Sequence, residues 1–342
     1  MRKEELEENE TMSGHVFKNT AFLLLLTVLL VLASCKSSPD TNTIPPQFKG
    51  GNVGLEMYYL DGMPPAVIYD NGQLPFAIGL IISNVGEADV GPGTPNPFVE
   101  VSLTGINPVQ FGVTEADLVQ SLATELRGSK MNFDGQPIDG DITQVTFDGL
   151  SYLPDLFGTS PIAIRSNLCY DYQTFTTTQI CIKNDVVETS GDVSICQARG
   201  EKIPQNSGGP VHITSLVQNP LNNNKIQVVF QIEHVGTGQI FARTEGEHCD
   251  YSVRNLRNKN VVDVIVRPLD DPNYRISCPR FKGSNQGSVV LLNGAPTQVT
   301  CTIENVGGSS VQVFQDWLDI ELRYRYGQYI DQQILIQDTP QP

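Results

Sequence analysis

Histidine, tryptophan and basic residues are scarce in this sequence. The 342 residues include four histidines, one tryptophan and 22 Lys+Arg against 38 Asp+Glu, which gives a formal charge of −16. An acidic chain repels phosphate backbones, so we expect no nucleic acid partner. Only His212, His234 and His248 follow residue 34. This scarcity argues against a histidine-based metal site.

Sequence motifs that carry catalysis or cofactor binding are also missing. The chain has no GxSxG nucleophile elbow, no HExxH motif, no phosphate-binding loop and no CxxC pair. We therefore expect a protein that is not an enzyme and that has no cofactor. No Asn-x-Ser/Thr acceptor for N-glycans follows Cys35.

The one long apolar run lies near the N-terminus. Residues 21–33 (AFLLLLTVLLVLA) are fewer than the roughly 20 that span a bilayer, but they match the apolar core of an export signal. The tetrapeptide at 32–35 (LASC) resembles the lipobox of prokaryotic lipoproteins. That resemblance implies that residues 1–34 are a removed signal peptide and that Cys35 carries lipid. An uncleaved membrane anchor is the alternative.

The flanks of this run refine the prediction. The acidic first eleven residues do not fit the basic start of a signal, so Met12 is an alternative start site. Residues 36–50 are polar and contain prolines, which predicts a tether after the lipidated cysteine at 35. We expect the rest of the chain to be exported and anchored to the outer face of the cell membrane.

Six further cysteines agree with export, because an even number in an exported chain suggests three disulfides. Cys169 and Cys181 flank an expected hairpin centred on Phe175, so we expect them to pair. Cys278 and Cys301 bracket two expected strands and form the second pair. Cys196 with Cys249 follows by elimination. A thiolate metal site is the alternative, but it lacks a CxxC motif.

Most of the remaining chain consists of short alternating apolar runs separated by Gly, Pro, Asn and Asp. Examples are KIQVVFQI (225–232), VVDVIV (261–266) and QVTCTI (298–303). Alternation with many β-branched residues predicts half-buried strands. The regular turns between the strands predict a mainly β protein of β-sandwiches.

Two internal repeats indicate how the strands are grouped. Three strands end in similar turns, ISNVG (82–86), IEHVG (232–236) and IENVG (303–307). In the second repeat, LCYDY (168–172) precedes QICI (179–182), and LRYRY (322–326) precedes QILI (333–336), with six identities at a constant offset of 154. We expect each copy of the second repeat to form a hairpin that closes a domain.

These repeats divide the chain into a sandwich at 51–190, a small β module at 196–270 and a C-terminal β module at 271–338. The last two are alternatively one domain. The first carries an insertion at about 105–150 with the one helix candidate. Thr114 is its expected N-cap, Asp117 occupies the capping-box position and Gly128 ends it. The expected apolar stripe is Leu118, Val119, Leu122 and Leu126.

The strand-to-turn pattern with a closing hairpin resembles the CARDB-type immunoglobulin-like modules of prokaryotic, most similarly archaeal, surface lipoproteins. The matching motifs are GLEMY (54–58), PP (64–65), IY (68–69) and the Asn84-x-Gly86 turn. The resemblance covers most of 51–338 and implies tandem immunoglobulin-like β-sandwiches, the first with the helical insertion. It also implies adhesion or interaction at the cell surface, with the membrane, other surface proteins or glycans as partners.

We therefore expect a non-catalytic interaction or structural protein of the cell envelope. The alternative is a ligand-binding lipoprotein, for example a carbohydrate-binding one, accessory to a transporter or surface complex. Its expected ligand surface is an aromatic platform, because sugars offer apolar faces to rings; ordinary sheet packing is the competing interpretation. The platform residues are Trp317, Tyr324, Tyr326 and Tyr329.

Two other clusters of polar residues are weaker candidates. Asp134, Asp139 and Asp141 could supply oxygen ligands to Ca²⁺, although a solvated loop is the simpler interpretation. Asp263 with Asp270 and Asp271 is a weaker version of the same idea. The run His248-Cys249-Asp250 offers a thiol beside an imidazole, but adjacent residues of a strand point to opposite faces, so we expect a disulfide there.

Overall fold

The computed structural model describes residues 47–339 except 184–195, 223, 245, 247, 253–255, 268, 270, 271, 293, 294 and 308–312. The chain divides into two compact units, 1–45 and 46–342, and all described residues belong to the second. The expected signal peptide, Cys35 and most of the tether therefore lie outside the described residues. Within the described part, no helix is long and apolar enough to cross a membrane.

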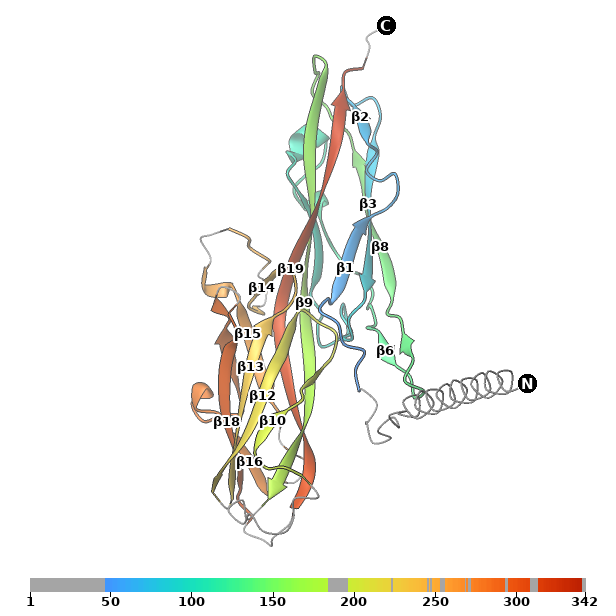
Figure 1. Cartoon of the computed structure of the whole chain (residues 1–342). Helices are drawn as coiled ribbons and strands as arrows, with labels where there is room; N and C mark the ends of the chain where they lie inside the picture. The colour runs from blue at the N-terminus through green and yellow to red at the C-terminus, as the bar shows by residue number, and fades with distance from the viewer. Residues whose placement is uncertain are drawn as a thin grey trace, which may run out of the picture. The chain divides into compact units, whose positions relative to one another are not determined.

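Two strands of 25 residues each, β9 (Thr159–Lys183) and β19 (Val313–Gln337), form the centre of this unit. They pair antiparallel along their whole length, from Thr159 opposite Gln337 to Lys183 opposite Val313 (Figure 1). We call this pair the central ribbon. The two expected hairpins are therefore wrong. Residues 173–178 (QTFTTT) contain no turn-forming residue and are rich in threonine, so the strand continues.

The first sandwich uses one half of the ribbon. A three-stranded sheet of β1 (Leu55–Tyr59), β3 (Phe76–Asn84) and β8 (Ile142–Leu150) packs on it. In the ribbon layer, β4 (Val99–Thr104) pairs with β9 and β5 (Val119–Ser121) pairs with β4. On the other side, β2 (Val67–Tyr69) pairs parallel with the end of β19.

The second sandwich uses the other half. Its five-stranded sheet has the order β10 (Gly200–Lys202), β12 (Val211–Asn222), β13 (Lys225–His234), β18 (Thr297–Asn305) and β16 (Tyr274–Ser277). In the ribbon layer β15 (Val261–Val266) pairs with β19, and β17 (Gln286–Val290) pairs with β15. The short strands β11 (Gln205–Asn206) and β14 (Gln239–Phe241) pair with β9 and β19, respectively.

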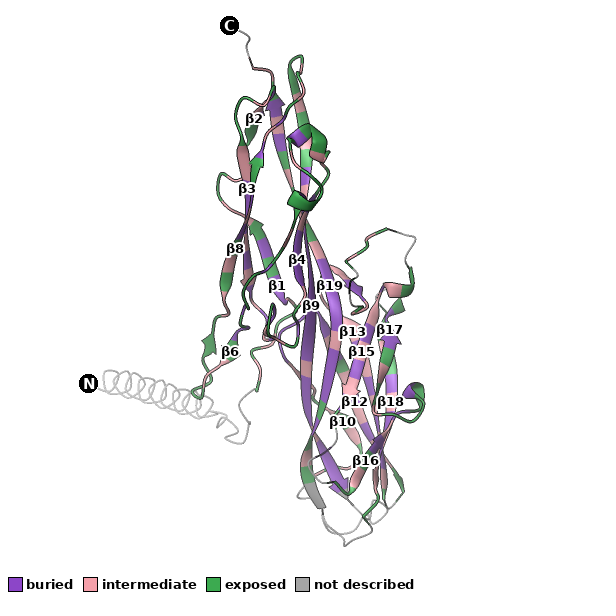
Figure 2. Ribbon diagram, turned by 180° about the vertical axis from the view of Figure 1, so that it is seen from behind, coloured by how far each residue is buried: buried purple, intermediate pink, exposed green. Residues whose placement is uncertain are grey.

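The remaining described elements are short. β6 (Lys130–Met131) and β7 (Pro137–Ile138) form a two-stranded hairpin. Four 3-10 helices complete the list: η1 (Pro108–Phe111), η2 (Ala116–Leu118), η3 (Leu256–Asn258) and η4 (Pro279–Phe281). One buried apolar core runs through both sandwiches and along the inner face of the ribbon (Figure 2).

The two sandwiches repeat one pairing scheme. In chain order β1, β3, β4, β5, β8 and β9 correspond to β12, β13, β15, β17, β18 and β19, with equivalent neighbours in each sheet. The 154-residue offset carries Tyr170 to Tyr324 and Tyr172 to Tyr326, and these four pair crosswise in the ribbon. The same offset carries Asp171 to its own partner, Arg325. A local two-fold axis therefore passes through this pair.

The mainly β expectation is confirmed, but three separate modules are not formed. The sheet that holds β12 and β13 also holds β18 and β16, so 196–270 and 271–338 contribute to one sandwich. Both long strands belong to both sandwiches, so no boundary near residue 190 separates two independent sets of strands.

The helix expected from Thr114 is wrong, and its expected capping box forms only in part. The backbone N and the Oγ1 of Thr114 donate to Asp117 Oδ2 at 2.8 and 2.7 Å. Only the single turn η2 follows, because Val119 is extended and pairs with Ser102 at the open edge of β4. Leu118, Leu122 and Leu126 are buried along an extended path. Tertiary pairing has overridden a local helix signal.

All six described cysteines form disulfides, which indicates an oxidising environment. The expected Cys278–Cys301 bond is confirmed. The other two expected pairs are wrong, because Cys169 bonds Cys249 and Cys181 bonds Cys196. Cys169 and Cys181 lie on one continuous strand, which separates them by about 40 Å at roughly 3.3 Å per residue.

Candidate functional site

Four buried tyrosines lie on the inner face of the ribbon where the two sandwiches join. Tyr170, Tyr172, Tyr324 and Tyr326, which we call the tyrosine cluster, are at most 3% exposed. Their ring centroids lie 5.7 to 6.5 Å from one another around the cluster, mostly edge to face. Such contacts stabilise beyond simple area burial. For Tyr324 and Tyr326 the competing interpretation, ordinary sheet packing, is therefore confirmed.

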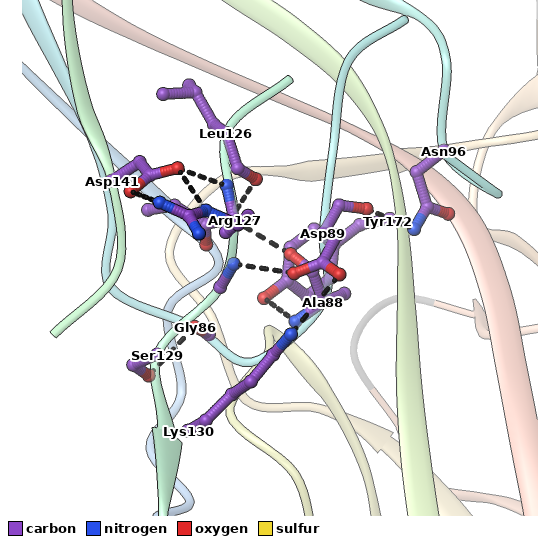
Figure 3. Close-up of polar contacts among 12 residues, drawn as sticks. Gly86, Ala88, Asp89, Asn96, Leu126, Arg127, Ser129, Lys130, Asp141 and Tyr172 are labelled. Atoms are coloured by element: carbon purple, nitrogen blue, oxygen red, sulfur yellow. Dashed lines mark hydrogen bonds and ion pairs between the residues drawn. The ribbon is translucent and has the colours of Figure 1, made fainter. Parts of the chain in front are cut away.

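Each sandwich sets a strand-end turn against one hydroxyl of this cluster. The backbone N of Ala88 donates to the Tyr172 hydroxyl (Figure 3), and the backbone N of Gly238 donates to that of Tyr326. A side chain at Gly86 would overlap the Tyr172 hydroxyl oxygen, and one at Gly236 would overlap that of Tyr326. The two sequence repeats therefore contact each other: the strand-end turns of one repeat pack on the tyrosines of the other. The third copy of the turn instead places Gly307 against the Asn273 side chain.

Burial keeps these hydroxyls protonated. It raises the pKa of Tyr172 well above its ordinary value and that of Tyr326 to about 12. Burial also lowers the pKa of His234, whose Nε2 lies 3.2 Å from the Tyr326 hydroxyl. The same hydroxyl accepts a hydrogen bond from the backbone N of Gly238.

The outer face of the ribbon carries a buried charge cluster at the local axis. Asp171 accepts from Arg325 Nε at 2.8 Å and forms an ion pair with Arg243 at 3.4 Å. The Arg325 guanidinium lies 3.9 Å from the centre of the Phe98 ring. Asp171 and Arg325 are only 5% and 3% exposed, so each charge is compensated by the other.

The segment beyond β14 is fastened to this outer face. Cys249 bonds Cys169 of β9, and His248 Nδ1 lies 2.7 Å from Glu100 Oε2 on β4. Arg243 donates from its guanidinium to the carbonyl of Pro95. These contacts connect a segment of the second half to the first sandwich. They also place the predicted His248-Cys249-Asp250 run in a structural disulfide, so Cys249 offers no free nucleophile.

Glu87 joins three separate segments at the junction. Its carboxylate accepts from the backbone N of Lys49 and Gly50, each at 2.9 Å, and from that of Gly208 at 2.6 Å. One side chain therefore fixes the beginning of the described chain, the first strand-end turn and the entry to the second half. Sequence reasoning missed Glu87, since its partners are remote backbone groups that carry no residue signature.

The predicted aromatic ligand surface is not formed. Tyr324 and Tyr326 lie in the core, whereas Trp317 and Tyr329 are 39% and 49% exposed on the opposite face of β19. Trp317 and Tyr329 are about 40 Å apart along the strand at roughly 3.3 Å per residue. The Arg165 guanidinium already covers the Tyr329 ring at 3.7 Å. The four side chains therefore offer no common platform to a sugar.

The predicted calcium ligands do not converge either. Asp141 is bound by Arg127 through hydrogen bonds of 3.0 and 3.2 Å, and Asp134 and Asp139 are exposed on the hairpin of β6 and β7. Asp263 Oδ1 accepts from the Ser288 hydroxyl at 2.6 Å. Asp270 and Asp271 lie outside the described residues.

Among the described residues, a different acidic trio meets at the far end of the first sandwich. Asp70, Asp155 and Asp338 bring one carboxylate oxygen each within 4.8 Å of one another. Both oxygens of the buried Asp70 accept backbone hydrogen bonds, from Leu156 at 2.9 Å and Thr339 at 2.8 Å. The bond from Leu156 is the main reason why the pKa of Asp70 is lowered. These two hydrogen bonds hold neighbouring loops in place. They explain the buried Asp70 carboxylate without a metal ion.

An open pocket of about 380 Å³ lies beside Phe175. The Arg267 guanidinium stands 6.0 Å from the centre of the Phe175 ring and pairs with the buried Glu321. The pocket therefore offers a partly exposed ring beside polar groups. Its lining residues are Gln47, Phe48, Phe175, Thr176, Arg267 and Asp319.

The chain matches no family model and no curated protein. It has weak likenesses to solved structures. A serine-rich repeat adhesion glycoprotein from Streptococcus agalactiae shares 8% identity at a TM-score of 0.17, over 87% of this chain and 100% of that chain. A protein of unknown function from Porphyromonas gingivalis W83 shares 7% identity at 0.14, over 76% and 97%. Likenesses at these TM-scores carry no argument for fold or function.

Proposed function

We propose that this chain is a non-catalytic interaction or structural protein of the cell envelope, exported and held at the outer face of the membrane through Cys35. The observation that supports it best is the central ribbon, which makes two sandwiches a single body. Flexible attachment between modules needs a linker, whereas here 25 paired residues cross the junction. Such a body holds its surface loops at fixed separations, which suits recognition between large partners.

The topology supports immunoglobulin-like modules with an exchanged strand. In the first sandwich, β1-β3-β8 matches the A-B-E order and β5-β4-β9 matches C′-C-F. The G position beside F is filled by the second half of β19, and the second sandwich receives the second half of β9 in return.

Intact-mass analysis of the protein extracted from membranes, with an unreduced peptide map, tests the anchor and the compartment. We expect a chain that begins at Cys35 with added acyl mass and with the bonds Cys169–Cys249, Cys181–Cys196 and Cys278–Cys301. A membrane-impermeant amine reagent applied to intact cells should label the exposed Lys282. Free thiols in these six cysteines, or labelling only after lysis, would contradict the proposal.

A second candidate function is binding of a small ligand in the Phe175 pocket. The partly exposed ring beside Gln47, Arg267 and Asp319 combines an apolar face with hydrogen-bonding groups, as carbohydrate sites do. A glycan array that gives signal with the native protein and loses it with Phe175→Ala would favour this function. Phe157→Ala is the matched control, because Phe157 is fully exposed in the first sandwich and should leave the signal unchanged.

A further inference from the structure

The hairpin of β6 and β7 presents apolar side chains to solvent. Phe133 at its tip is fully exposed, Ile138 is 56% exposed, and Ile142 just after the hairpin is 64% exposed. Phe133 and Ile138 belong to the hairpin itself, whereas Ile142 begins β8 and pairs with Ser83. Large exposed apolar side chains of this kind can mark an interaction surface. We call the hairpin segment that carries Phe133 and Ile138 the hairpin tip.

The tip is a turn that is closed by hydrogen bonds. Asn132 Oδ1 accepts from the backbone N of Asp134 at 3.0 Å and of Gln136 at 2.7 Å, and its backbone pairs with Gly135 and Gln136. Gly135 has a φ of +74°, which closes the turn. The turn therefore holds Phe133 outward.

The base of the hairpin is fixed to the junction of the sandwiches (Figure 3). Gly128 N donates to Asp89 Oδ1 at 2.8 Å, and Ser129 N donates to the Gly86 carbonyl at 2.7 Å. Arg127 forms its two bonds with Asp141 where the chain leaves the hairpin. Hydrogen bonds to the first sandwich therefore fix both ends of the hairpin.

The tether reaches the same place. Lys49 and Gly50 are bound by Glu87, the residue that follows Gly86. Phe133 is five residues beyond Gly128, so it lies within about 18 Å of that base at roughly 3.5 Å per residue. The 12 residues from Cys35 to position 46 span at most about 40 Å. A lipid on Cys35 and the hairpin tip can therefore meet one surface together.

We propose that Phe133 and Ile138 insert into the interfacial layer of the lipid bilayer, as a second attachment beside the lipid anchor. The proposal rests on the proposed function, since it takes the lipidated Cys35 as given. An apolar tip of this size buries at the headgroup boundary and cannot cross the membrane. Asp134 and Asp139 outnumber Lys130 on the hairpin, so the chemistry favours a zwitterionic surface over an anionic one.

Depth-dependent tryptophan quenching tests the contact. Trp317 is the single native tryptophan, so Trp317→Phe with Phe133→Trp places one reporter at the tip of the full lipidated chain. The chain is reconstituted in phosphatidylcholine vesicles with brominated acyl chains. Phe157→Trp in the same background is the matched control, because Phe157 is equally exposed at the far end of the first sandwich. We expect at least about threefold stronger quenching for F133W than for F157W.

Vesicle flotation separates the two proposals. If the chain floats with the vesicles and F133W is quenched no more than F157W, the anchor stands and the hairpin contact is overturned. If the chain does not float and F133W is not quenched, both are overturned. An emission shift of F133W that appears with protein concentration and not with lipid would identify a second copy of the chain as the occupant, and it would also overturn the hairpin contact.

Discussion

At the scale of single residues, Gly86 and Gly236 carry the contact between the strand-end turns and the tyrosine cluster. A Cβ at Gly86 would overlap the Tyr172 hydroxyl and come within 2.9 Å of the Gly208 carbonyl. We expect Gly86→Ala to lower the free energy of unfolding by about 1–3 kcal/mol, as overpacking of a core does. Urea denaturation of the oxidised protein measures it.

The hydroxyl can be removed as a control. Tyr172→Phe alone deprives Ala88 N and the Gly208 carbonyl of a partner, at about 1–3 kcal/mol. In the double variant Gly86→Ala with Tyr172→Phe, the alanine methyl group occupies the space left by the tyrosine hydroxyl. The double variant should therefore lose less free energy of unfolding than the two single variants lose together. Additive losses would show that the overlap with Tyr172 is not what disfavours alanine.

His234 makes stability depend on pH. Its pKa in the folded protein is lowered by burial below the ordinary value of 6.5, so the unfolded chain binds the proton more readily. The stability from neutral His234 is complete above about pH 6.5 and is lost as the pH falls below it, by at most about 1.4 kcal/mol per pH unit. Unfolding measured near pH 7.5 and near pH 5.5 should show this loss.

His234→Gln tests the assignment, since glutamine can accept from the Tyr326 hydroxyl without titrating. We expect this variant to lose part of the pH dependence. The rest should remain, because burial lowers the pKa of His212 as well. An unchanged slope between the two pH values would mean that His234 is not the titrating group.

At the scale of elements, the Cys169–Cys249 disulfide constrains more chain than Cys181–Cys196, with sequence separations of 80 and 15. Loop-closure entropy then predicts losses of about 4.5 kcal/mol for Cys169→Ala with Cys249→Ala, and about 3 kcal/mol for Cys181→Ala with Cys196→Ala. Urea unfolding of the two double variants compares them. A greater loss from the shorter loop would contradict this order.

Strands could be predicted from the sequence, but strand continuity could not. In β13 the alternation of KIQVVFQI records a single buried face, which is a local property. The same alternation in β9 is compatible with a hairpin or with one long strand. The choice depends on β19, whose Trp317 pairs with Gln179 far away in the chain. The expected Cys169–Cys181 pair was wrong for this reason, and the Cys196–Cys249 pair that followed from it by elimination was wrong with it.

The helix was predicted wrongly, and the contacts at the junction of the sandwiches were not predicted, for related reasons. Thr114 and Asp117 form one of the two bonds of a capping box, and the free edge of β4 takes the following residues into a strand. Glu87 and Asp171 have partners that come together through topology. The 154-residue repeat did contain the position of Asp171 and Arg325, but only the antiparallel register shows that they are partners.

At the scale of the whole molecule, the shared ribbon should make the two sandwiches unfold together. Phe147→Ala removes a 2% exposed ring from the first sandwich, at about 3–5 kcal/mol. We expect amide hydrogen exchange to accelerate in β13 of the second sandwich as well as in β3. Phe133→Ala, at an exposed site of the same half, is the control and should leave both unchanged. Unaltered protection in β13 would mean that the halves unfold independently.

The local axis through Asp171 and Arg325 also bears on ancestry. If two identical half-chains associated with this geometry, residue 171 of one would face residue 171 of the other, and an aspartate there would meet its own charge. A duplicated and fused gene removes that restriction, since each copy can then diverge. The opposite charges at this position are thus an arrangement open to one chain with two diverged copies and closed to a symmetric homodimer of identical halves.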